Sequence, residues 1–152
     1  MKGTRTNIDV GGVLHTGREL DVRETVLLPE FASYRFAAPV RVDLTLRRLG
    51  RGIDVRGTIE ASAQGECARC LEPVSLPLQL AVAEQIDPAG DRLDPLAENN
   101  VLGDDGLDLD DLARQLIASA LPLALLCADD CAGLCANCGR KRDGNCRCPF
   151  TE

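Results

Sequence analysis

Apolar and polar side chains alternate most regularly between residues 39 and 63, in the stretch PVRVDLTLRRLGRGIDVRGTIEASA. The apolar positions are Val40, Val42, Leu44 and Leu46 before the central LGRG, and Ile53, Val55, Ile59 and Ala61 after it. A period of two places the apolar side chains of a strand on one face of a sheet. Glycines between two such runs are typical of a turn. The pattern therefore predicts an antiparallel hairpin with one buried face.

Three further segments are predicted as strands. Residues 74–86, VSLPLQLAVAEQI, alternate in the same way. Pro77 has no N–H to donate to a neighbouring strand, so this segment is predicted to be an edge strand or to contain a bulge. Residues 7–22 (NIDVGGVLHTGRELDV) and residues 24–31 (ETVLLPEF) are the other two.

One helix is predicted, over residues 107–123. Leu109, Leu112, Leu116 and Ala120 follow the spacing of one helical face. Asp108 is the candidate N-cap, two more aspartates occupy the first turn, and Pro122 ends the helix. The helix is expected to cover an open face of the sheet.

Residues 87–106, between the last predicted strand and the helix, contain turn residues and no steady period, which predicts a long acidic loop. The chain carries a net charge of −7, and most of the negative charge lies here. From Glu84 to Asp111 there are ten acidic residues and one arginine. The acidity is therefore local and leaves room for an anionic partner elsewhere on the surface.

Composition and termini narrow the class of protein. A chain of 152 residues is long enough to bury a core without disulfides. The first fifteen residues contain no apolar segment typical of a signal peptide, and no apolar run approaches the roughly 20 residues of a membrane span. We therefore expect a cytoplasmic protein with reduced thiols and no membrane partner.

Eight cysteines carry the strongest chemical signal. They form four close pairs: 67/70, 127/131, 135/138 and 146/148. A C-x2-C pair in a tight turn places two thiolates at half-site spacing, and two half-sites complete a four-coordinate zinc site. Disulfides and an iron–sulfur cluster are less favoured alternatives. The C-x3-C-x2-C spacing of residues 131–138 also matches radical S-adenosylmethionine enzymes, but so few residues follow that we interpret the match as accidental.

The spacing leaves two partitions of these ligands open. In one, Cys135, Cys138, Cys146 and Cys148 form a local site, and Cys67, Cys70, Cys127 and Cys131 form a second site that ties the sheet to the segment after the helix. In the other, a single site forms and the remaining thiols are free or buried in the core. One or two Zn²⁺ ions per chain are expected.

The predicted fold class is α+β: an antiparallel β-sheet or partial barrel, one covering helix and a C-terminal cysteine-rich zinc knuckle. Residues 1–152 are predicted to form a single domain. Within it, residues 1–86 are mainly β, 87–106 the acidic loop and 107–123 the helix. Residues 127–148 are the zinc knuckle, packed with the 67–70 C-x2-C pair.

Catalytic residues are not evident. His15 has no obvious nucleophile nearby in the sequence, and the aspartates between residues 104 and 111 lack the spacing of a calcium loop. We therefore expect a protein that is not an enzyme and has no small-molecule substrate. Two basic groups are candidate RNA contacts: Arg47, Arg48 and Arg51 at the hairpin tip, and Arg140, Lys141 and Arg142 in the knuckle. The alternative interpretation is that they are solvated charges.

Three segments together resemble the YceD family of large ribosomal RNA subunit accumulation proteins: CARCLEPV (67–74), LDLDDLARQLIASALPLALLC (107–127) and CAGLCANCGRKRDGNCRC (131–148). The resemblance implies a bacterial or plastid protein that is needed for accumulation of large-subunit ribosomal RNA. It also implies a shared role for Cys67 and Cys70 with the pair Cys127 and Cys131.

The leading functional hypothesis is thus a nonenzymatic zinc-binding factor in large-subunit biogenesis, which contacts ribosomal RNA or a large-subunit ribosomal protein. The alternative is a thiol or zinc redox-responsive regulatory or protein-interaction module.

Overall fold

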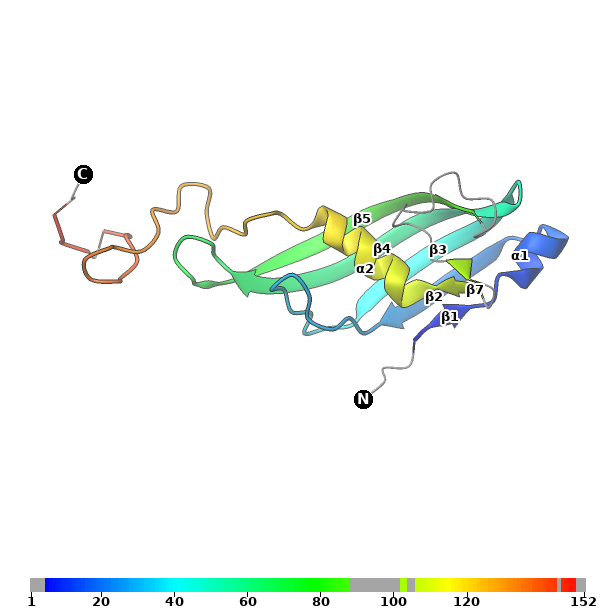
Figure 1. Cartoon of the computed structure of the whole chain (residues 1–152), viewed down its shortest axis with the longest axis horizontal. Coiled ribbons are helices and arrows are strands. Elements are labelled where there is room, and N and C mark those ends of the chain that lie inside the picture. Colours follow the sequence, from blue (N-terminus) through cyan, green and yellow to red (C-terminus); the bar gives the residue numbers. More distant parts are fainter. Residues whose placement is uncertain (1–4, 88–101, 104–105, 145, 150–152) are drawn as a thin grey trace.

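The computed structural model describes residues 5–87, 102–103, 106–144 and 146–149 of an elongated molecule, in which two antiparallel sheets and two helices are followed by an irregular C-terminal segment (Figure 1). The elements in chain order are β1 (Asn7–Ile8), α1 (Gly11–Thr16), β2 (Leu20–Val26), β3 (Val40–Leu49), β4 (Gly52–Glu66), β5 (Pro73–Ile86), β6 (Leu102–Gly103), β7 (Gly106–Asp108) and α2 (Leu109–Ala120). The α+β class predicted from the sequence is confirmed.

The larger sheet has the strand order β2-β3-β4-β5, so each strand pairs with its neighbour in sequence. The predicted hairpin is the β3–β4 pair, whose register runs from Arg41↔Glu60 to Leu49↔Gly52. β5 lies at one edge of this sheet, as the proline at position 77 predicted. Its pairing with β4 continues without a break from Ile53↔Ile86 to Glu66↔Pro73.

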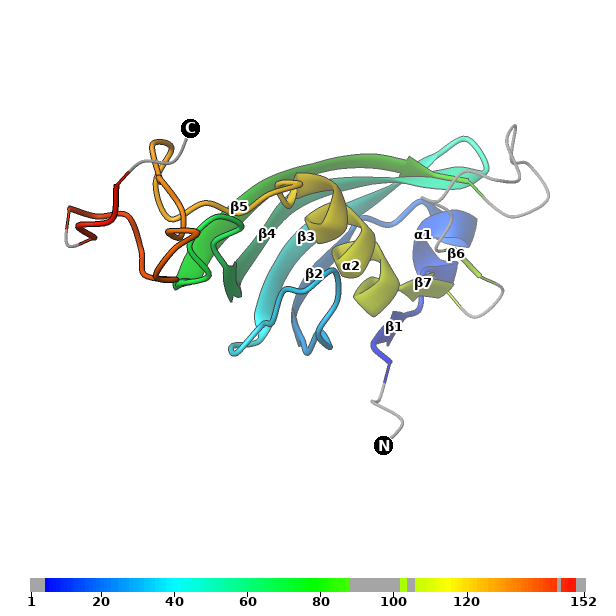
Figure 2. The same ribbon diagram turned by 60° about the vertical axis from the view of Figure 1, so that its left-hand side comes forward.

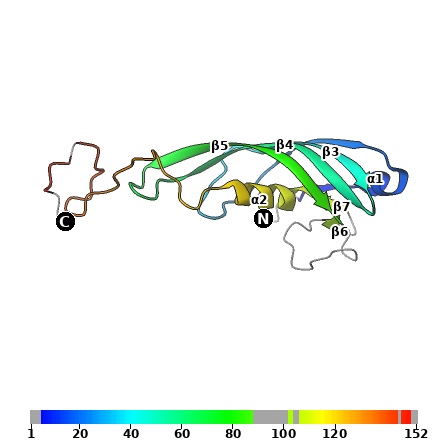
Figure 3. The same ribbon diagram turned by 90° about the horizontal axis from the view of Figure 1, so that it is seen from above.

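The core lies between the larger sheet and α2, which rests on one face of the sheet (Figures 2 and 3). The sheet contributes the apolar positions of its alternating strands, and α2 contributes one stripe of its surface. Both sets are buried: Val42, Leu44, Leu46, Ile53, Val55 and Ile59 from β3 and β4, and Leu109, Leu112, Ala113 and Ile117 from α2. Burial of these side chains supplies the hydrophobic stabilisation of the fold.

α2 is shorter than the predicted 107–123 helix. Its N-cap is Asp108, as predicted, and the Asp108 carboxylate accepts a hydrogen bond from the Asp111 N–H at 3.0 Å. Residues 107 and 108 belong to β7, where Leu107 pairs with Ile8 of β1. The helix ends at Ala120. Its C-cap, Leu121, is extended because the residue before a proline avoids the helical region.

Two other sequence predictions need correction. The segment 7–22, predicted as a strand, contains a short helix, α1, between β1 and β2, so the described part of the chain has two helices rather than one. Its alternating residues are interrupted by two adjacent glycines, and Val13 turns into the core from the helix. The predicted strand 24–31 ends at Val26 within β2.

The predicted acidic loop lies largely outside the described residues. Within its described part, residues 102–103 form β6, and residue 106 begins β7. These two strands join β1 in a small three-stranded sheet with the order β1-β7-β6. Short backbone pairing between distant segments leaves little periodic signal in the sequence, so this sheet was not predicted.

Candidate metal centres

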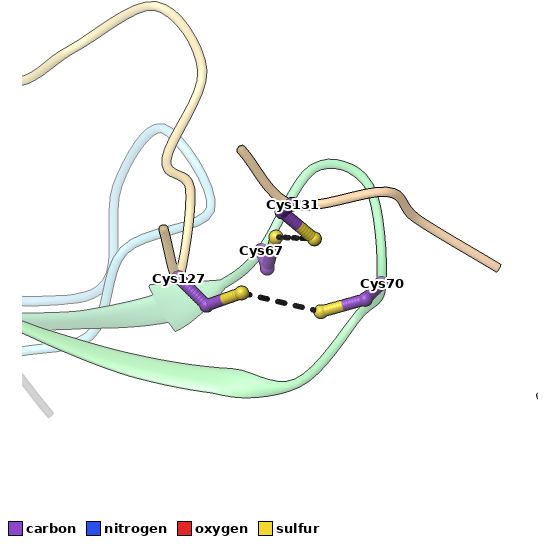
Figure 4. A group of neighbouring side chains, drawn as sticks. All are labelled: Cys67, Cys70, Cys127 and Cys131. Atoms are coloured by element: carbon purple, nitrogen blue, oxygen red, sulfur yellow. Dashed lines mark hydrogen bonds between the residues drawn. The ribbon is translucent and has the colours of Figure 1, made fainter. Parts of the chain in front are cut away.

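Four cysteines meet where the β4–β5 turn contacts the segment after α2. Cys67 and Cys70 lie in the turn, and Cys127 and Cys131 lie in the segment (Figure 4). The sulfur atoms of Cys67 and Cys131 are 3.8 Å apart, and those of Cys70 and Cys127 are 3.6 Å apart. All four sulfur atoms lie within 4.8 Å of one another, which defines a first tetrad.

Hydrogen bonds from backbone and side-chain donors hold the two halves of the first tetrad together. The Ala68 N–H donates to the Leu125 carbonyl at 2.7 Å, and the Arg69 guanidinium donates to the Cys131 carbonyl at 2.9 Å. Leu125 is buried against Tyr34, whose hydroxyl donates to the Pro122 carbonyl at 3.1 Å. The segment that leaves α2 is therefore fastened along the end of the sheet before it reaches the cysteines.

Cys135, Cys138, Cys146 and Cys148 form a second tetrad, also with all sulfur atoms within 4.8 Å of one another. The sulfur atoms of Cys138 and Cys146 are 3.6 Å apart. Cys135 is buried, Cys138 is exposed and the other two are half-buried. In the first tetrad three of the four cysteines are buried, so the second tetrad is the more open of the two.

The two C-x2-C turns repeat one hydrogen-bond pattern. In the first, the Cys67 N–H donates to the Glu72 carbonyl and the Leu71 N–H donates to the Cys67 carbonyl, at 2.8 and 2.9 Å. In the second, the Cys135 N–H donates to the Arg140 carbonyl and the Gly139 N–H donates to the Cys135 carbonyl, both at 2.8 Å. The two tetrads are therefore built on turns of the same kind.

Backbone N–H groups in each turn stabilise one thiolate. The N–H groups of Cys70, Cys127 and Arg69 lower the pKa of Cys67 to about 6, against the opposing effect of burial. Those of Cys138 and Asn137 lower the pKa of Cys135 to about 6 in the same way.

The other thiols of each tetrad respond to their neighbouring sulfurs. Hydrogen bonds with the thiols of Cys131 and Cys70 raise the pKa of Cys127 to about 12. Those with Cys138 and Cys135 raise the pKa of Cys148 to about 12. Four thiolates at this spacing repel one another, so full deprotonation of a tetrad requires a compensating cation.

Both tetrads fit a single tetrahedral metal ion. A zinc–sulfur bond of about 2.3 Å places the four ligand sulfurs of a tetrahedral site about 3.8 Å apart. Two sulfur–sulfur distances in the first tetrad, 3.8 and 3.6 Å, and one in the second, 3.6 Å, agree with this spacing, and the others lie within 4.8 Å. A disulfide needs sulfurs about 2.05 Å apart, and all eight cysteines are free thiols. The geometry thus groups the eight cysteines into two sets, the first of the two partitions that the spacing left open.

Contacts between the turns join the two tetrads. Lys141 forms an ion pair with Glu72 at 2.5 Å, and this hydrogen bond raises the pKa of Lys141. Residues 134 and 141 also form an isolated bridge within the second turn. Glu72 and Arg69 were not singled out from the sequence, because their role depends on segments about 60 residues away. No local pattern signals such a contact.

The two predicted basic groups lie at opposite ends of the molecule: the β3–β4 turn at one end and the knuckle at the other (Figure 1). At the hairpin tip, Arg47 is paired with Glu19 at 2.6 Å and Arg48 donates to the Gly50 carbonyl at 3.2 Å. In the knuckle, Lys141 is committed to the ion pair with Glu72. The structure therefore does not combine the two groups into one basic surface.

No helix among the described residues is long and apolar enough to cross a membrane. Two mycobacterial proteins described as uncharacterised are similar to this chain. The one from Mycobacterium tuberculosis is 31% identical over 131 residues, 81% of this chain and 63% of the relative. The one from Mycobacterium leprae is 29% identical over 113 residues, 72% of this chain and 52% of the relative. No solved structure matches.

The chain thus spans less than two thirds of the length of these relatives. The family model described as large ribosomal RNA subunit accumulation protein YceD matches residues 55–152, which contain β4 from Val55 onward, β5, α2 and both cysteine tetrads. The resemblance noted in the sequence is therefore confirmed, and the chain belongs to the YceD family.

Proposed function

We propose that this protein is a nonenzymatic zinc-binding factor that supports accumulation of large-subunit ribosomal RNA. The observation that supports metal binding is the spacing of the sulfur atoms in the two tetrads. The name of the family supports the link to the large ribosomal subunit. The structure of the tetrads and the name of the family bear on different parts of the proposal, so each part has its own test.

Zinc is the metal that best suits these donor sets. Four thiolates in a tetrahedral arrangement are typical of structural zinc sites, in which no coordination position remains for a substrate. In the first tetrad, Cys67 and Cys70 belong to the sheet, while Cys127 and Cys131 belong to the chain that leaves α2. Ligation by both pairs would fasten the helix exit to the sheet and add to the free energy of unfolding.

Contact with the ribosomal partner is proposed at the ends of the molecule rather than on the open face of the sheet. The arginines on that face are paired with acidic residues: Arg23 with Asp43 and Arg41 with Glu60 across strands, and Arg56 with Asp54 within β4. Their charge is therefore largely compensated. The hairpin-tip and knuckle groups are our candidates for phosphate contact because each brings three basic residues close together in the chain, although Arg47 is paired with Glu19 and Lys141 with Glu72. The acidic stretch between Glu84 and Asp111 suits a basic ribosomal protein.

Elemental analysis together with affinity purification tests this proposal. We expect two zinc ions per chain and enrichment of large-subunit ribosomal RNA precursors with the tagged protein. A protein that binds iron instead of zinc would contradict the metal assignment. Zinc-loaded protein that enriches no ribosomal RNA or ribosomal protein would contradict the ribosomal role while leaving the metal assignment intact.

A second candidate function is a redox-responsive regulatory or protein-interaction module. One observation favours it: Cys138 of the second tetrad is exposed, and oxidants reach exposed thiolates first. Oxidation of Cys138 and Cys146, whose sulfurs are 3.6 Å apart, would form a disulfide and release the metal. The oxidant would accept the two electrons from the two thiolates.

A further inference from the structure

The outer edge of β5 presents unpaired backbone groups in a defined order. β5 is the last strand of the larger sheet, and among the described residues no segment pairs with its outer side. In Figure 2 it runs along the upper margin of the sheet. The hydrogen bonds of the neighbouring strand β4 determine which residues of β5 point their backbone N–H and C=O groups outward.

The hydrogen bonds of Gln64 in β4 show which backbone groups of β5 point away from β4. Its N–H and C=O both bond to Arg35, at 2.8 Å each, on the side away from β5. In an antiparallel pair, the N–H and C=O of one residue point to the same side, and successive residues alternate. Gln64 therefore makes no backbone hydrogen bond to Ser75, its partner on β5, and the backbone groups of Ser75 point outward.

The unbroken β4–β5 register extends this alternation along the whole strand. The outward residues are Pro73, Ser75, Pro77, Gln79, Ala81, Ala83 and Gln85. Pro77, which lacks an N–H, fits this outward position. Beyond it, four consecutive outward residues offer both a donor and an acceptor to a further strand.

The side chains of these outward residues carry no charge, and all are exposed. Edge strands that avoid pairing are usually protected by charged side chains or by shortness. The opposite edge strand, β2, follows that rule, with Asp21, Arg23 and Glu24 among its seven residues. The 14-residue β5 has prolines at positions 73 and 77 and one charged residue, Glu84, whose backbone groups do not point outward. The uncharged outward residues after Pro77 are suited to a strand that is equally uncharged.

We infer that this edge pairs with the same edge of a second copy of the chain. A two-fold axis at Val82 places Gln79 opposite the partner's Gln85 and Ala81 opposite the partner's Ala83. Each of the four resulting pairs exchanges two backbone hydrogen bonds, about eight in all. Two side-chain amides then meet at each end, small side chains meet in the centre, and no like charges lie opposite each other.

Other registers are less favourable. An axis at Ala81 places Pro77 of each chain opposite the Gln85 of the other, and two carbonyls lose their donors. An axis at Ala83 places Gln79 of each chain opposite the Asp87 of the other, so an acidic residue enters the paired segment. Only the axis at Val82 uses all four outward residues after Pro77 and excludes the proline. The result is a continuous antiparallel sheet across two chains with the cysteine knuckles at its far ends.

The dimer is expected to be reversible, because pairing of two strand edges buries less surface than a permanent interface. Each chain carries a net charge of −7, so added salt should strengthen the association by screening repulsion. Analytical ultracentrifugation of the zinc-loaded protein between about 1 and about 500 μM covers the range of weak dimers. We expect the mass to rise with concentration from 16.3 kDa towards twice that value.

Two proline variants test the site. Ala81→Pro removes a central outward N–H and should reduce dimerisation at least tenfold, while zinc content and melting temperature stay close to those of the wild type, since Pro77 shows that the edge accepts proline. Ser75→Pro is the matched control. The backbone groups of residue 75 also point outward but lie outside the paired segment, so this variant should dimerise like the wild type.

Amide hydrogen exchange identifies the occupant. For a dimer, protection of the N–H groups of residues 79, 81, 83 and 85 should increase with protein concentration. Fast exchange of these four amides at every concentration, together with a mass of one chain, would overturn the inference. Protection that is independent of concentration, or that appears only on addition of a ribosomal fraction, would overturn it too, because another segment or another protein would then occupy the edge.

Discussion

Leu71 occupies in the first C-x2-C turn the place that Gly139 occupies in the second. Each lies four residues after the first cysteine of its turn and donates its N–H to that cysteine's carbonyl. Both have left-handed backbone conformations, with φ of 62° and 70°. Glycine adopts this conformation without steric cost, whereas a leucine is strained in it.

Replacement of Leu71 by glycine should therefore stabilise the protein. The Leu71 side chain is 59% exposed, so its loss removes little buried surface, and relief of the backbone strain exceeds the extra flexibility of glycine in the unfolded chain. We expect a gain of about 0.5–1 kcal/mol in the free energy of unfolding, measured by denaturant titration of the zinc-loaded protein. The reverse change, Gly139→Leu, should cost a similar amount. A Leu71→Gly variant of lower stability would show that the exposed leucine makes a contact that outweighs its strain.

Two cysteine substitutions should separate the tetrads. Cys67→Ser removes a buried ligand that joins the sheet to the helix exit, and we expect a loss of about 3 kcal/mol or more, or about 10 °C in melting temperature. Cys146→Ser alters only the knuckle, so the main unfolding transition should change little. Each variant should retain one zinc ion of two, measured by elemental analysis. Wild-type zinc content and melting in both variants would refute the metal proposal.

Gly57 should be essential for the β3–β4 hairpin. A Cβ at this position would lie 2.0 Å from the Asp43 carbonyl oxygen, and φ is 151°. We expect Gly57→Ala to lower the free energy of unfolding by at least about 2 kcal/mol. Gly12→Ala is the control, because nothing lies within 4 Å of its added Cβ and it stands in a helix. That variant should be neutral or slightly stabilising, as circular dichroism during thermal unfolding can show.

Charge reversal should distinguish the two ends of the molecule in RNA binding. One variant changes Arg47, Arg48 and Arg51 to glutamate, and the other changes Arg140, Lys141 and Arg142. If an end contacts phosphates through all three groups, its variant should lower the slope of log affinity against log salt by about 2. Filter binding to large-subunit ribosomal RNA at several salt concentrations measures this slope.

The two losses should add when the variants are combined, since the ends are far apart (Figure 1). Binding that neither variant alters and that does not depend on salt would exclude both groups as phosphate contacts. The proposed contact between the acidic stretch and a basic ribosomal protein would then be the next part of the proposal to test.

Zinc release by a mild oxidant should occur in two phases. The exposed Cys138 makes the second tetrad the first to react, and the buried Cys67 and Cys70 delay the first tetrad. The absorbance of a colorimetric zinc chelator, recorded over time after hydrogen peroxide is added, follows both phases of zinc release. Prior removal of the second site by Cys138→Ser should abolish the fast phase and leave the slow one. Equal rates for the two ions would contradict the assignment of the knuckle as the redox-sensitive centre.

Local periodicity was sufficient to predict the longest elements of this protein. The alternation in residues 39–63 predicted the β3–β4 hairpin, Pro77 predicted an edge strand or a bulge at β5, of which the edge position is observed, and Asp108 predicted the start of α2. These features follow from the chain itself, because side-chain direction in a strand, the missing N–H of proline and helix capping act over a few residues. The cysteine spacing likewise identified four half-sites.

Tertiary structure decided how those half-sites combine and where the charges lie. Cys67 meets Cys131 across 64 residues only because the end of the sheet and the segment after α2 are fastened by the contacts of Ala68, Leu125 and Tyr34. The same arrangement paired Lys141 with Glu72 and separated the two basic groups to opposite ends. Contacts of this kind depend on how whole elements pack, and no pattern within one segment records them.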